Sequence, residues 1–247
     1  MWFLDRTARQ LRLNPALLTH RPTDPDRLET LLRLYDPGLT VSGDRFTARG
    51  TRLRLAEVTE DQATLARVPA GRRGAVIACG GGRAASRYLL AGLAARLGGT
   101  LYPPGEYDDA CAYVDLEVRL DGHLRVGCER VAELVCPILG ERTVDHDHDL
   151  RVCRIEGRKG DPILVTYEYP NHPPRRPGRL SPGGPAHDSG HVVGLEIEAR
   201  DPHRSDMEIL YRAALAVSSA TGGGIYSMDF PVIRFEDVVP VGDRLVW

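Results

Sequence analysis

The chain has 247 residues, enough for one large domain or two small ones with a buried core. Its hydrophobic fraction of 42% and charged fraction of 27% are ordinary for a globular protein, and no apolar run reaches the ~18 residues of a membrane helix. The net charge of −2 and the aromatic content of 6% provide neither a basic excess nor a stacking platform for nucleic acid. We therefore expect a soluble protein with no membrane partner and no nucleic-acid partner.

The five cysteines are odd in number and include no C-x-x-C pair. This pattern favours neither a disulfide framework nor a zinc ribbon. The sequence instead predicts buried free thiols in a reducing, cytoplasmic environment. The cysteines are Cys79, Cys111, Cys128, Cys136 and Cys153.

The first forty residues predict a helical segment. The run Asp24-Pro25-Asp26 is typical of a helix start, with proline near the first helical position and acids in the first turn. Four apolar residues then follow with the spacing of one helix face: Leu28, Leu31, Leu32 and Tyr35. After this segment the alternation of Arg52 to Val58 predicts the first strand.

A strand, an amphipathic helix, paired glycines and a short strand occur twice, about 120 residues apart. The first copy covers residues 74–102 and the second covers residues 194–226. The glycines suit helix ends, because glycine adopts the left-handed conformation without strain. The duplication predicts two similar α+β subdomains of the ferredoxin-like type.

Between the copies the pattern predicts hairpins and one short helix. Tyr113–Leu120 alternates, and Asp121-Gly122 suits a tight turn to a returning strand at His123–Val126. A helix is predicted at Glu129–Leu139, before a second hairpin of Val152–Glu156 with Ile163–Tyr169. The predicted organisation is a helical N-terminal segment (1–40), a first α+β unit (41–140), and a second α+β unit (141–247) with a Pro/Gly-rich insertion at 170–190.

The insertion holds six prolines and four glycines in 21 residues and has no apolar periodicity. Long segments of this kind are either functional loops or disordered, and both alternatives remain open. Its basic front half can bind an acidic partner or ligand, and an acidic loop earlier in the chain can bind a basic one. The predicted partner-binding residues are Arg175, Arg176, Arg179, Glu106, Asp108 and Asp109.

The run Asp145-His146-Asp147-His148-Asp149 has the strongest metal-binding character in the chain. If this run is extended, His146 and His148 lie on one face, and imidazole suits zinc or iron. His187 or His191 can complete such a site. The alternative is a solvated acidic turn between two elements.

A glycine-rich turn between the first repeat strand and its helix is a candidate anion site. It consists of Gly80, Gly81, Gly82 and Arg83, where backbone N–H groups at a helix start can bind a small anionic ligand. The turn lacks the Gly-Lys-Ser/Thr ending of a nucleotide-binding loop. The alternative is a tight turn, for which glycine is the usual residue.

Two functions of different classes remain open. The first is a cytoplasmic interaction protein of bacterial type, inhibitor or toxin-immunity-like, which binds a protein partner through charged loops. The second is a biosynthetic or metal-assisted enzyme, with zinc or iron at the four histidines near the interface of the repeats. A nucleic-acid-processing protein is a third interpretation, based on fold-level analogy alone.

Overall fold

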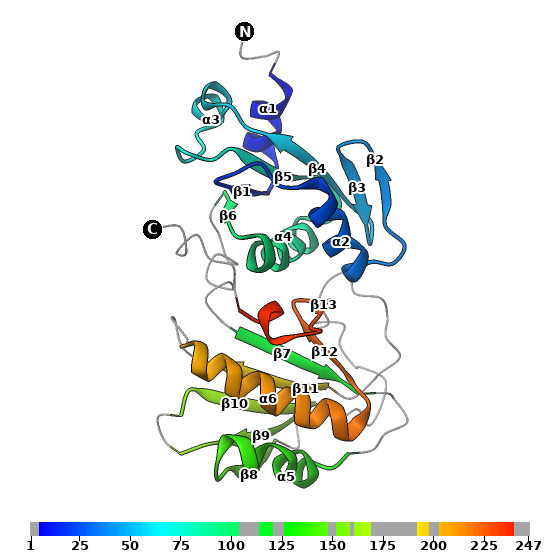
Figure 1. Ribbon diagram of the computed structural model, residues 1–247, viewed down its shortest axis with the longest axis vertical. Helices are drawn as coiled ribbons and strands as arrows, with labels where there is room; N and C mark the ends of the chain where they lie inside the picture. The colour runs from blue at the N-terminus through cyan, green and yellow to red at the C-terminus, as the bar shows by residue number, and fades with distance from the viewer. Residues whose placement is uncertain are drawn as a thin grey trace. The chain divides into compact units, whose positions relative to one another are not determined.

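The computed structural model describes residues 5–103, 114–120, 126–147, 152–158, 161–168, 192–197 and 203–239 (Figure 1). Contacts within the chain divide it into two units. Of the described residues, those from 5 to 103 form the first unit and those from 114 to 239 form the second. We describe each unit by itself.

The first unit is an antiparallel sheet in the order β2-β3-β4-β5-β1-β6. Helices α1 and α3 pack on one face of this sheet, and α2 and α4 pack on the other (Figure 1). Its elements are α1 (Arg6–Leu13), β1 (Ala16–Thr19), α2 (Pro25–Tyr35), β2 (Thr40–Ser42), β3 (Arg45–Ala48), β4 (Thr51–Glu57), α3 (Glu60–Ala66), β5 (Gly74–Gly80), α4 (Arg83–Leu97) and β6 (Thr100–Tyr102).

Strand β1 corrects the prediction of a helix throughout the first forty residues. All four of its residues are buried, because Ala16 and Leu18 face α1 and α3 while Leu17 points to the opposite face. A short, continuous apolar run does not distinguish a buried strand from a helix by periodicity. The predicted helix start is confirmed, since the Asp24 side chain accepts a hydrogen bond from the backbone N–H of Asp26 and caps α2.

The second unit is also antiparallel, in the order β13-β12-β7-β11-β10-β9-β8. Helices α5 and α6 lie on the same face of its sheet (Figure 1). Its elements are β7 (Val114–Arg119), α5 (Cys128–Leu139), β8 (Thr143–Asp147), β9 (Val152–Glu156), β10 (Ile163–Glu168), β11 (Val192–Ile197), α6 (Arg204–Thr221), β12 (Gly224–Ser227), β13 (Phe230–Pro231) and the 3-10 helix η3 (Phe235–Asp237).

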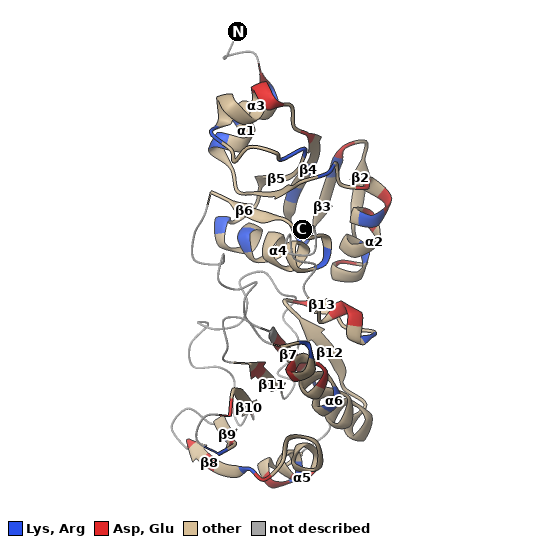
Figure 2. Ribbon diagram, turned by 60° about the vertical axis from the view of Figure 1, so that its left-hand side comes forward, with Lys and Arg blue, Asp and Glu red and all other residues tan. Residues whose placement is uncertain are grey.

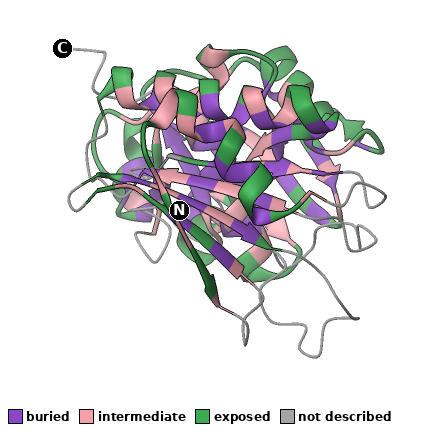
Figure 3. Cartoon of the chain, turned by 90° about the horizontal axis from the view of Figure 1, so that it is seen from below, coloured by how far each residue is buried: buried purple, intermediate pink, exposed green. Residues whose placement is uncertain are grey.

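The core of the second unit follows from strict alternation along its strands. On β11, Val193, Leu195 and Ile197 are buried, while the residues between them keep solvent contact. The buried positions pack against one stripe of α6 that includes Leu210 and Val217. Buried residues therefore gather where the helices meet the strands (Figure 3). Each Å² of apolar surface removed from water stabilises the fold by ~25 cal/mol, so this layer is the main stabilising feature of the unit.

The two units share one topology. Apart from α3, which lies between β4 and β5, the order β1-α2-β2-β3-β4-β5-α4-β6 in the first unit matches β7-α5-β8-β9-β10-β11-α6-β12 in the second. Matching strands occupy matching places in the sheets. Four described strands lie between the two matched helices, whereas a ferredoxin-like βαββαβ unit has two. The mixed α+β class is thus established, and an internal repeat of the sequence stays a prediction.

Two local predictions have different outcomes. The hairpin of Val152–Glu156 with Ile163–Tyr169 is confirmed, because β9 and β10 pair antiparallel. The hairpin predicted for Tyr113–Val126 falls largely outside the described residues, and the described strand β7 pairs with β11 on one edge and with β12 on the other. Helix α5 shares a core with α6, so the second unit begins before β7 instead of near residue 141.

No helix within the described ranges is long and apolar enough to cross a membrane.

Candidate functional site

The face of the second sheet that points away from α5 and α6 is charged. Its outward positions include Asp115, Glu117 and Arg119 on β7, and Gly194 and Glu196 on β11. The strand register places Glu196 directly opposite Asp115, and Gly194 opposite Glu117. All five residues are partly or fully exposed. Figure 2 shows acidic positions in red on β7 and β11.

The same alternation continues across the remaining strands of the sheet. Arg154 on β9 lies between Asp145 on β8 and Thr166 on β10, on the same outward face. We call this surface the acidic face. It carries seven carboxylates and two guanidiniums, a formal charge of −5, from Asp115, Glu117, Asp145, Asp147, Glu156, Glu168, Glu196, Arg119 and Arg154.

The matching face of the first unit has the opposite character. There, the residues of β1 and β5 that point to α1 and α3 are Ala16, Leu18, Ala75 and Ile77, and all four are buried. Among the described residues of the second unit, no helix packs on the acidic face. One topology therefore supports an apolar, covered face in one unit and a charged face in the other.

Arg119 organises one corner of the acidic face. Its Nε and Nη2 groups donate to the Glu117 carboxylate at 3.0 and 2.7 Å, and Nη2 also donates to Asp229. The guanidinium carbon lies 4.4 Å from the centroid of the Tyr226 ring, within cation–π distance. Burial alone would lower the pKa of Arg119, but its pairs with Asp229 and Glu117 raise it. One guanidinium here faces two carboxylates, so this corner keeps a formal charge of −1.

Asp115 lies on the same strand as Glu117 and Arg119. Burial and, after it, the negative charges of Glu117 and Glu196 together raise the pKa of this carboxyl to about 7, against a smaller lowering by Arg119. The side chain nevertheless has exposed surface, so the repulsion fixed by the strand register is the firmer of the two causes. A positive group placed over Asp115 and Glu196 would relieve this repulsion.

The carboxylates of the acidic face are spread along the strands and do not converge on one point. Within the described residues, only Cys128, His146 and Cys153 bring three potential ligand atoms close enough for a single metal ion. The acidic face therefore suits several separate positive charges, such as the side chains of a basic protein surface, better than a single cation.

The cysteine–histidine cluster lies on the other face of the same sheet. Cys128 is the first residue of α5, while His146 and Cys153 are register partners on β8 and β9. Cys128 and Cys153 are joined by a disulfide, and His146 Nδ1 lies 3.3 Å from Cys153 Sγ. On the other side of the ring, His146 Nε2 lies 3.6 Å from Glu129 Oε1.

This pairing corrects the prediction that all the cysteines are free thiols. The β8–β9 hairpin and the start of α5 bring Cys128 and Cys153 together, although 25 residues separate them in sequence. Such a spacing matches no cysteine motif, so the pair becomes visible only when the start of α5 is placed against β9. Cys79 and Cys136 are free and partly buried.

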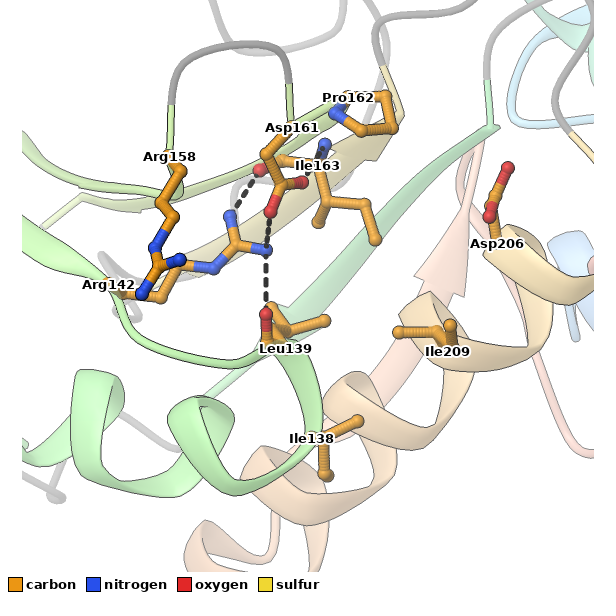
Figure 4. A pocket seen from close by; sticks show the side chains of 9 residues that line it. All are labelled: Ile138, Leu139, Arg142, Arg158, Asp161, Pro162, Ile163, Asp206 and Ile209. Carbon is orange, nitrogen blue, oxygen red and sulfur yellow. Dashed lines mark hydrogen bonds and ion pairs between the residues drawn. The ribbon is translucent and has the colours of Figure 1, made fainter.

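A pocket of about 370 Å³ lies where α5 ends and β10 begins (Figure 4). Arg142 is buried beside it and donates to the backbone oxygens of Leu139 and Ile163 and to the Asp161 carboxylate at 3.2, 2.6 and 2.7 Å. These bonds join the end of α5 to the start of β10. Arg142 is therefore a structural link, and the protein itself uses most of its donors.

Most residues predicted to form sites lie outside the described residues. This is so for the predicted partner-binding loops and for three of the four candidate metal ligands. Of the predicted histidines only His146 is described, and its neighbours are cysteines. The predictions outside the described ranges are Arg175, Arg176, Arg179, Glu106, Asp108, Asp109, His148, His187 and His191.

Two of the three glycines in the glycine-rich turn, Gly80 and Gly81, have a structural reason. A Cβ on Gly80 would come within 2.5 Å of the Arg52 guanidinium, and Gly81 has a φ of +113°. Gly82 caps α4 without a side-chain hydrogen bond, and Arg83 is the first helical residue. The tight-turn interpretation accounts for these contacts, and an anion site at this turn stays a prediction.

No protein-family model matches the chain, and comparisons with curated proteins and with solved structures give no significant match. Functional inference therefore depends on the geometry of the described residues alone.

Proposed function

We propose that this chain is an interaction protein, inhibitor or toxin-immunity-like, which binds a basic protein partner through the acidic face of its second unit. The observation that carries the proposal is the difference between the two units. A sheet face that is apolar and covered in the first unit carries seven carboxylates in the second. A globular fold gains nothing from placing like charges directly opposite each other, so a binding role explains them better.

Charge complementarity defines the partner. The carboxylates cover all the strands from β7 to β8, which suits a protein surface better than a small ligand. Proteins that act on nucleic acids carry basic surfaces of this kind, since they must neutralise phosphates. An acidic face that occupies such a surface would inhibit its owner. The sequence-based alternative, a metal-assisted enzyme at four histidines, gains no support from contacts among the described residues.

The test is binding of a short oligoarginine peptide, measured by fluorescence anisotropy at low and at physiological ionic strength. A face variant combines Glu156→Gln, Glu168→Gln and Glu196→Gln. A matched control combines Glu133→Gln, Glu141→Gln and Glu208→Gln on the helical side, where all three glutamates are exposed. Both variants lose the same net charge, so they differ only in location.

We expect the native chain and the control to bind the peptide with similar affinity. Three exposed charge contacts at ~0.5 kcal/mol each imply that the face variant binds about tenfold more weakly. Equal loss in both variants would mean that the peptide senses only net charge, and unchanged binding in the face variant would mean that the acidic face is not used. Either result would overturn the proposal.

A further inference from the structure

A second feature of the same unit points to a metal site that is independent of the acidic face. Three residues from three elements meet at one point: Cys128 from α5, His146 from β8 and Cys153 from β9. The two sulfurs and one ring nitrogen lie within 4.8 Å of one another. A tetrahedral zinc ion with Zn–S bonds of ~2.3 Å needs ligand atoms about 3.8 Å apart, so a small rotation of the cysteine side chains suffices once they are reduced.

We infer that the reduced protein binds one zinc ion through Cys128 Sγ, Cys153 Sγ and His146 Nδ1. Two thiolates and an imidazole are the donors that zinc favours in proteins. The disulfide and the metal site use the same sulfurs, so each excludes the other. On binding, both thiols lose their protons to solvent as two Zn–S bonds form, and no electron is transferred.

The surroundings of the three donors support this assignment. The carboxylate of Glu129 lies 3.6 Å from His146 Nε2, and a carboxylate at that nitrogen favours the tautomer in which Nδ1 carries the lone pair that a metal binds. Cys128 occupies the first position of a helix of 12 residues, where the partial positive charge of the helix start favours a thiolate. Cys153 is fully buried and Cys128 nearly so, which protects the Zn–S bonds from exchange with solvent.

The geometry also indicates what the metal would do. It would join the start of α5 to the β8–β9 hairpin at the edge of the sheet, where β8 is the last strand. The His146 side chain is 35% exposed, so a metal held here would be reached by solvent from the His146 side. The described residues thus supply three protein ligands, an arrangement that leaves one position open to water or to an added ligand.

The experiment measures metal in the intact chain after reduction with a phosphine, which becomes a phosphine oxide with oxygen from water as the disulfide becomes two thiols. The reductant is removed, and the chain is equilibrated with zinc in the presence of a competing chelator. Zinc per chain is counted by mass spectrometry. Cobalt(II) serves as a spectroscopic probe, because thiolate ligation gives a charge-transfer band and tetrahedral cobalt gives intense visible bands.

We expect one metal ion per chain, with thiolate-to-cobalt absorption. Cys128→Ser and His146→Ala should each weaken zinc binding at least about 100-fold, and Glu129→Gln should weaken it about tenfold. Cys136→Ser is the matched control on the same helix and should retain full binding. His146→Ala alters a partly exposed residue, so it tests the site without disturbing the core, and circular dichroism confirms that it folds.

The inference would be overturned if the reduced native chain lost its zinc to the chelator as readily as Cys128→Ser does. It would also be overturned if Cys128→Ser and His146→Ala kept the metal, since the ion would then bind elsewhere, for example at the predicted histidines. Neither result would bear on the acidic face, because oligoarginine binding is measured separately.

Discussion

The two units of this protein have the same sheet topology. They differ in the second face of each sheet, the face that points away from the matched helices. In the first unit that face is lined by residues such as Leu18 and Ile77 and is covered by α1 and α3. In the second unit the matching strands present Asp115, Glu117 and Glu196. In both units the other face packs against the matched helices, α2 and α4 in the first and α5 and α6 in the second.

The difference separates what the fold requires from what it permits. Both units need one apolar face, because only burial against the matched helices makes the sheet stable. The second face can be either buried or exposed, since an antiparallel sheet tolerates solvent on one side. Function is therefore best sought where the two units differ.

Exchanging the character of the second face should produce the largest effect. Ile77→Glu places a carboxylate in the closed layer between β5, α1 and α3 and should destabilise the first unit by about 4 kcal/mol or more. Glu196→Ile in the second unit should be neutral or stabilising, because it removes the repulsion with Asp115. Urea denaturation followed by circular dichroism measures both changes. Similar losses from the two substitutions would show that the two faces do not differ in burial.

A smaller effect should follow from removing the arginine that fastens α1 to its sheet. Arg54 donates to Asp44, to Gln10 at 2.5 Å and to Thr7 at 3.4 Å, and the last two residues belong to α1. Arg54→Ala should cost about 2 kcal/mol and speed amide exchange in residues 6–13. Arg154→Ala, on the acidic face, should cost less than about 0.5 kcal/mol. If amide exchange in α1 were as slow in Arg54→Ala as in the native chain, Arg54 would not hold α1 on the sheet.

The effect expected to be smallest concerns pH, because solvent screens the exposed carboxyl of Asp115. Because the pKa of Asp115 is raised to about 7 from an ordinary value of 3.8, the folded chain holds a proton that the unfolded chain releases between these values. Folding stability from this group is therefore present below pH 4 and is lost as the pH rises to 7. Asp115→Asn should make the protein relatively more stable at pH 8 than at pH 4. If the difference in folding stability between the native chain and Asp115→Asn were the same at pH 4 and at pH 8, Asp115 would not hold a proton in the folded chain.

Part of the fold could be predicted because local signals agreed with it. The helix start at Asp24, the β9–β10 hairpin and the helix α5 all follow from caps, turns and periodicity close to each element. Helix α3 carried a sequence signal that was missed: Thr59 and Gln62 form a capping box.

The remaining features depend on long-range pairing, which local patterns do not encode. β7 alternates clearly, but its partners are β11 and β12, more than seventy residues away. The His146–Cys153 pair follows only from the β8–β9 register, and the acidic face follows only from the alignment of five strands. The charges themselves are visible in the sequence, but only the strand order places them on one face.

The most direct test of the acidic face as a binding surface is carboxyl footprinting with carbodiimide and an amine label, read by mass spectrometry. We predict that Glu156, Glu168 and Glu196 are labelled in the free chain and become protected when oligoarginine is added. Glu133, Glu141 and Glu208 should be labelled equally in both states. If the three face residues were already protected in the free chain, or stayed labelled with peptide bound, the acidic face would not be the site of binding.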